Sequence, residues 1–157
     1  MITSRWIPAL LFAIVPAASF AADADIAVVV NKANPADNVT KVQLRKMLLA
    51  EQGKWSDGKK VSALLRSSGP ERDVVLHYIC GMSGLEFEQY FVHANFSGET
   101  GAMPKSLGSA IVVRQLVASV PGSIGFLRMS DVTDAVKVVK LDGVAPGDPA
   151  YKLKEGN

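Results

Sequence analysis

The fold of this chain is decided by residues 61–72, which have the sequence VSALLRSSGPER. The apolar run at 61–65 predicts a buried strand, and the chain from Pro70 onward has the spacing of an amphipathic helix. Between the two stand an arginine, two hydroxyl residues and a glycine, where free N–H groups and the helix dipole favour negative charge. Pro70 removes one of those N–H donors, and Glu71 places a carboxylate beside the rest. The stretch therefore predicts a strand–loop–helix unit whose loop is an incomplete oxyanion site.

Strand and helix patterns alternate along the rest of the chain, which is typical of an α/β domain. Apolar, largely β-branched runs predict further strands at 26–30, 124–127 and 136–141. Helix-start signals predict four helices, which begin at Thr40, Ser68, Ser83 and Ser109. The second helix has Ser68 and Glu71 in capping-box spacing and is expected to end at Gly81.

Several residues whose side chains could bind a ligand or react are better explained as parts of the core. The helical-spaced stripe of Phe87, Tyr90, Phe91 and Ala94 is typical of core packing, and Trp55 is expected to anchor a turn. Cys80 is the only cysteine, so no intramolecular disulfide is possible, and its apolar surroundings predict a buried, inert thiol.

His77 and Cys80 have a spacing that can chelate a metal, but a lone pair on an apolar helix favours a core role, and no metal site is predicted. The Pro- and Gly-rich tail from about residue 143 either docks through Tyr151 and Leu153 or frays.

Composition and the N-terminus limit the functional classes. Lysine and arginine number 17 and aspartate and glutamate 15, so the net charge is +2, and no nucleic-acid partner is indicated. Residues 1–21 have the pattern of an export signal, with Arg5, an apolar stretch and small residues before a cut after Ala21. We expect a periplasmic protein with one domain at 22–157, and no membrane span in the mature chain.

Four segments of the chain have recognisable motifs: residues 34–40 (NPADNVT), 54–58 (KWSDG), the loop with Arg66 and Gly69, and 117–126 (VASVPGSIGF). Together they resemble the phosphate ABC transporter substrate-binding family of the type 2 periplasmic binding proteins. The first three are similar to its helix entry, its tryptophan turn and its anion loop. Residues 117–126 (VASVPGSIGF) are similar to its Val-Ala-x-x-Pro-Gly-(Ala/Ser)-Ile-Gly-Tyr segment, and this match is the most specific. The resemblance implies an α/β fold of three layers, with about four to five strands and flanking helices.

The chain departs from that family in two ways. Full-length members have two lobes that close over the anion, whereas the length here predicts a single lobe. The family's anion loop has the pattern Arg-x-x-Gly-Ser-Gly-Thr, and Pro70, Glu71 and Arg72 stand here in place of its last three residues. Only Arg66 and Gly69 therefore match the anion-loop pattern of the family.

Two functions from different classes remain open. In the first, an exported solute-binding protein of an ABC-type uptake system binds phosphate or another oxyanion through Arg66, Ser67, Ser68, Gly69 and Arg72. In the second, an interaction or accessory module keeps the fold and has lost the ligand, and Arg66 pairs with Glu71 or Asp73. Neither function is enzymatic or requires a cofactor, and a homodimer or a membrane complex is the expected macromolecular partner.

Overall fold

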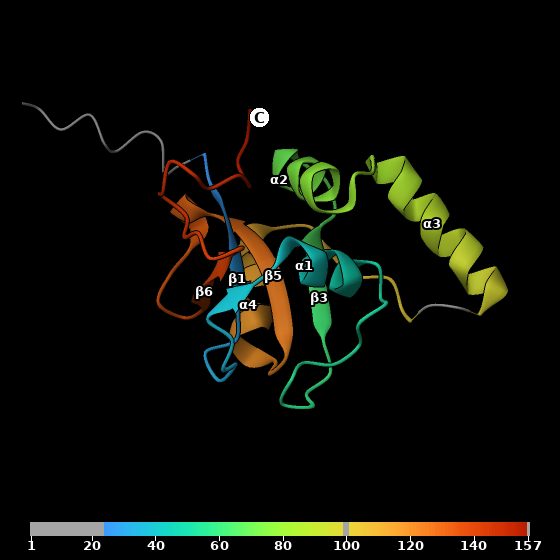
Figure 1. The fold of residues 1–157 in the computed structure, drawn as a ribbon, viewed down its shortest axis with the longest axis horizontal. Helices are drawn as coiled ribbons and strands as arrows, with labels where there is room; N and C mark the ends of the chain where they lie inside the picture. Colours follow the sequence, from blue (N-terminus) through green and yellow to red (C-terminus); the bar gives the residue numbers. More distant parts are fainter. Residues whose placement is uncertain (1–23, 99–100, 157) are drawn as a thin grey trace, which may run out of the picture.

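A computed structural model describes residues 24–98 and 101–156, so the predicted export signal lies outside the described residues. The described chain builds one six-stranded sheet in the order β2-β6-β1-β5-β3-β4 (Figure 1). The strands are β1 (Ile26–Val30), β2 (Asn38–Val39), β3 (Ser62–Arg66), β4 (Lys105–Leu107), β5 (Ser123–Arg128) and β6 (Lys137–Leu141). Strand β1 is antiparallel to both of its neighbours, and β3 is parallel to both β5 and β4.

The helices are α1 (Lys41–Leu48), α2 (Pro70–Val75), a π-helical turn (Leu76–Cys80), α3 (Gly84–Ser97), α4 (Ala110–Ser119) and a 3₁₀ turn (Met129–Asp131). The helix starts predicted at Thr40 and Ser83 are both observed, and each is closed by a capping box. The second helix differs from expectation, because Gly69 is its N-cap and Ser68 makes no capping hydrogen bond. The π-helical turn continues α2, and the whole helical segment ends, as predicted, at Gly81, which adopts the left-handed conformation.

The sheet separates two apolar layers, as the resemblance implied. Ile26, Val28 and Val30 face a cluster that contains the buried side chains of α1, α2 and α3. Ala27 and Val29 point to the other face, where they meet the buried valines of α4. The fold class is thus confirmed, and the count exceeds four to five strands because the short strands β2 and β4 join the sheet edges.

The C-terminal tail docks on the sheet. Tyr151 and Leu153 are buried, and the Tyr151 hydroxyl donates a 2.7 Å hydrogen bond to the Ile26 carbonyl. The Ile26 N–H donates to the Leu153 carbonyl at 2.9 Å. Of the two alternatives for this segment, docking is therefore the one observed. Trp55 is also buried, and its indole N–H donates to the Gly122 carbonyl at 2.8 Å, as expected of a turn anchor.

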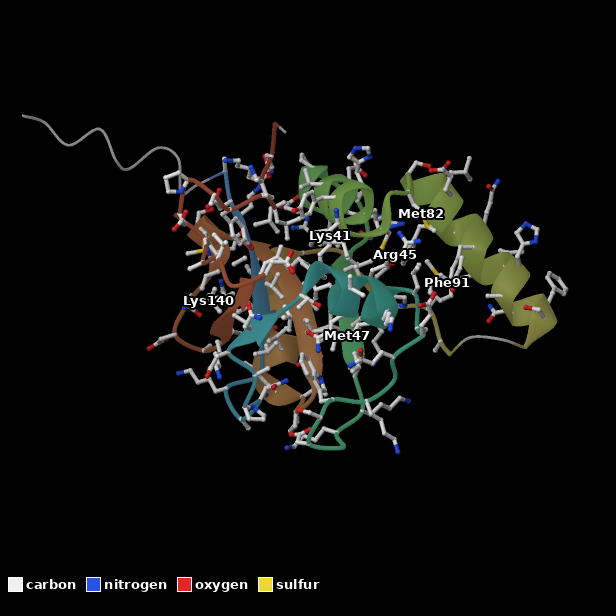
Figure 2. The ribbon with its side chains drawn as sticks, in the orientation of Figure 1. Lys41, Arg45, Met47, Met82, Phe91 and Lys140 are labelled. Atoms are coloured by element: carbon white, nitrogen blue, oxygen red, sulfur yellow. The ribbon has the colours of Figure 1, made fainter. Side chains whose placement is uncertain are left out.

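Helix α3 projects from the body of the molecule (Figure 1). It is attached along one side by Phe87, Phe91 and Ala94, which are buried, and the two phenylalanine rings meet edge to face. Figure 2 shows Phe91 pointing from α3 toward α1. Within residues 24–98 and 101–156, no helix is long and apolar enough to cross a membrane.

Candidate functional site

The loop between β3 and α2 is held at the carboxyl edge of the sheet. The Ser67 N–H donates to the Leu107 carbonyl at 2.8 Å, which extends the β3–β4 pairing beyond Arg66. Gly69 has a φ of 108°, a conformation that L side chains rarely adopt, and its carbonyl accepts from the N–H groups of Arg72 and Asp73. Ser67 and Ser68 are exposed residues of this loop.

Arg66 lies beside the loop and already has partners in the chain. Its guanidinium donates to the Gly108 carbonyl at 3.3 Å, and its Nη1 is 3.7 Å from Glu71 Oε1. Its Nε is buried and has no hydrogen-bond partner among the described residues. Arg66 is therefore partly satisfied, with one donor unused.

Glu71 is the centre of the charge cluster at this site. Its residue is 7% exposed, and its Oε1 lies 3.3 Å from Arg128 Nε as well as 3.7 Å from Arg66. Arg128 Nε also donates to Glu155 Oε1 at 2.6 Å, and this hydrogen bond raises the pKa of Arg128. Two guanidinium groups are thus matched by two carboxylates, all supplied by the chain itself.

Arg72 does not join this cluster. Its residue is 6% exposed, its Nη2 pairs with Glu88 Oε1 at 3.3 Å, and its guanidinium lies 5.9 Å from the centre of the Phe87 ring. Its Nη1 is buried and has no partner in the described part of the chain. Arg72 therefore fastens α2 to α3 instead of extending toward Ser67 and Ser68.

The carboxylates at the loop cancel much of the attraction that its arginines would exert on an anion. At 4 Å and an effective dielectric constant near 20, two unit charges interact by roughly 4 kcal/mol, whether they attract or repel. Glu71 lies beside both Arg66 and Arg128, so its repulsion of an anion is comparable to the attraction of one guanidinium.

Of the five residues predicted for the site, Arg66 ends strand β3, Ser67, Ser68 and Gly69 form the loop that follows, and Arg72 is turned away. Sequence reasoning anticipated the Arg66–Glu71 pair as one alternative but missed Arg128 and Glu155. A signal for Arg128 was present, because each of the two arginines is the last residue of a largely buried strand, β3 or β5. The carboxyl ends of neighbouring parallel strands lie at the same edge of a sheet.

The other candidate residues are less suited to bind a ligand or to react. Burial raises the pKa of the Cys80 thiol to about 11, which makes it a poor nucleophile and metal ligand at neutral pH. Among residues 24–98 and 101–156, no group of three His, Cys, Asp or Glu side chains could hold a metal ion. The Arg45 guanidinium donates to the Cys80 carbonyl at 2.6 Å, and the Lys41 ammonium lies over the Tyr78 ring, so both cations brace the helices (Figure 2).

A surface cavity of about 450 Å³ lies at the opposite end of β3, where Val61, Pro104 and Pro121 are among its lining residues. These residues precede or begin the parallel strands, whereas ligands of open α/β sheets bind beyond the carboxyl ends. The cavity is therefore separate from the Arg66 loop.

The fold is similar to that of several solved phosphate receptors. One is an ABC-type phosphate transport receptor from Vibrio cholerae, at 20% identity and a TM-score of 0.63, which covers 78% of this chain and 48% of that one. Another is a candidate phosphate ABC transporter substrate-binding protein with bound phosphate from Clostridium perfringens, at 22% identity and a TM-score of 0.67. This match covers 83% of this chain and 52% of that one. A third is PstS from Borrelia burgdorferi, at 16% identity and a TM-score of 0.62, and this match covers 83% of this chain and 54% of that one.

The chain has the fold of these phosphate receptors. It spans about half of their length, which is consistent with a single lobe of that fold. No protein-family model matches the sequence.

Proposed function

We propose that this protein is a non-enzymatic interaction module that retains the fold of a solute-binding receptor half, with its own carboxylate in the place of the oxyanion. The observation that carries the proposal is Glu71, which is 7% exposed and pairs with Arg66 and Arg128. An anion that entered the loop would have to displace this carboxylate or bind against its charge. Export through the predicted signal at 1–21, and hence a periplasmic location, belong to the same proposal.

The decisive experiment is a calorimetric titration of inorganic phosphate into the protein at low salt. We expect no saturable heat for the wild-type protein. The Glu71→Gln variant removes the competing charge at nearly constant shape and should show weak, saturable and salt-sensitive heat. Asp73→Asn is the matched control, because it removes an exposed carboxylate two residues along the same helix and should change nothing.

A second candidate function is capture of phosphate or another oxyanion for an ABC-type uptake system. It is favoured by the unpartnered Nε of Arg66 and by the exposed hydroxyls of Ser67 and Ser68. Saturable heat with the wild-type protein that is lost in Arg66→Ala would establish this function and overturn the interaction module.

A further inference from the structure

Helix α3 has two opposite apolar faces, and only one of them is covered. Its inner face carries the buried Phe87 and Phe91. On the other side, Leu85 is 66%, Val92 53% and Phe96 90% exposed. An exposed apolar stripe on a helix that projects from the body is a surface suited to a partner (Figure 1).

The outer stripe is symmetric along the helix. Leu85, Gln89, Val92 and Phe96 follow one another at intervals of four, three and four residues, and at about 100° per residue they lie on one face. If two such helices pack antiparallel about a two-fold axis, Leu85 of each copy lies opposite Phe96 of the other. Gln89 then lies opposite Val92. The surface is thus complementary to itself, which is what an isologous interface requires.

The charges beside the stripe favour the same arrangement. Helix α3 carries Glu86 and Glu88 in its first half and His93 in its second half, with no lysine or arginine. An antiparallel pair brings Glu86 of each copy beside His93 of the other, so a carboxylate meets a ring N–H donor. A parallel pair would instead set Glu86 of each copy beside Glu88 of the other, which is repulsive.

We propose that a second copy of this chain docks on the outer face of α3, forming an antiparallel two-fold dimer through Leu85, Val92 and Phe96. This inference rests on the proposed function as an interaction module and names its partner. A helix of 14 residues is roughly 21 Å long, so the contact is smaller than the standard interface of about 800 Å² per partner. The dimer is therefore reversible and dependent on concentration.

Cysteine cross-linking tests the arrangement directly. In the antiparallel dimer, residue 85 faces residue 96 of the other copy, while each residue lies roughly 16 Å from its own symmetry mate, beyond disulfide reach. Oxidation should therefore cross-link the double variant Leu85→Cys/Phe96→Cys and neither single variant. The native Cys80 is buried and should not interfere. Cross-linking of a single variant, or no cross-linking of the double variant, would overturn the proposal.

Sedimentation velocity over a range of concentrations tests the association without new cysteines. Val92→Ser should raise the dimer Kd about tenfold or more, because it removes one buried valine from each side. Ile111→Ser is the matched control, since Ile111 is a 56% exposed apolar residue on α4. A wild-type protein that stays monomeric, or a Val92→Ser variant that associates as the wild type does, would refute the proposal.

The two proposals fail separately. A monomer that gives no heat with phosphate would remove the α3 dimer and leave the interaction module in need of another partner. A dimer whose wild-type protein binds phosphate saturably would keep the α3 interface and overturn the proposed loss of ligand binding.

Discussion

Replacing Glu71 by glutamine should destabilise the fold, because the carboxylate is the shared partner of two arginines. Removing one member of a fully buried ion pair costs about 3–5 kcal/mol. The side chains of Arg66 and Arg128 are 22% and 36% exposed, and Arg128 keeps Glu155 at 2.6 Å, so solvent and the second carboxylate offset much of the loss. We expect Glu71→Gln to lower the free energy of unfolding by about 1–2 kcal/mol, near the lower end of what a hydrogen bond to a charged group contributes.

Urea unfolding followed by the fluorescence of the buried Trp55 measures this change, which corresponds to a fall in Tm of about 3–8 °C. Asp37→Asn is the control, because Asp37 also pairs with a cation, Lys137 at 2.7 Å, but its side chain is 86% exposed. No resolvable change is expected for that variant. If Glu71→Gln is as stable as the wild type, the carboxylate is not needed to balance the arginines, and the basis of the proposed function fails.

Three further predictions concern the core. Tyr151→Phe should cost about 1–2 kcal/mol in chemical denaturation, because it leaves the buried Ile26 carbonyl without its 2.7 Å donor. Gly125→Ala should cost about 1–3 kcal/mol in the same assay, since an added Cβ would lie 2.9 Å from Val113 Cγ1, and unchanged stability would contradict this packing. Burial raises the pKa of Cys80 from 9.0 to about 11. The contribution of this neutral thiol to the free energy of unfolding is therefore complete below pH 9 and is lost as the pH rises to about 11. The difference in unfolding free energy between wild type and Cys80→Ala should shrink over that interval, and iodoacetamide should modify the folded protein far more slowly than the urea-unfolded protein.

The elements with local signals were predictable from the sequence. The capping boxes at Thr40 and Ser83 formed because a hydroxyl and a carboxylate or amide three residues later satisfy free N–H groups without help from the rest of the fold. The same spacing failed at Ser68, because Pro70 occupies the first helical position and Gly69, with its positive φ, makes the entry.

Features that depend on distant residues were not predictable in this way. Strand β2 has only two residues, and its hydrogen bonds come from β6, about 100 residues later. Strand β4 carries no run of apolar residues and is paired only because β3 offers a free edge. In the site, Glu155 reaches Arg128 only because the tail is held against β1. Such pairings are set by the tertiary structure and leave little trace in a local pattern.

The carboxylates at the loop follow from the fold that this chain adopts. Parallel pairing of β3 with β5 brings Arg66 and Arg128 to one edge of the sheet, where both are partly removed from water. Two neighbouring cations in that position repel each other and need anions to balance them. A receptor that encloses its ligand on several sides can leave this balance to a bound oxyanion, because the enclosure supplies further donors. In the described part of this chain, Glu71 and Glu155 supply that balance. Arg66, which suggests a binding site in the sequence, is therefore paired within the fold in the structure, together with Arg128, and Glu71→Gln tests whether the two roles exclude each other.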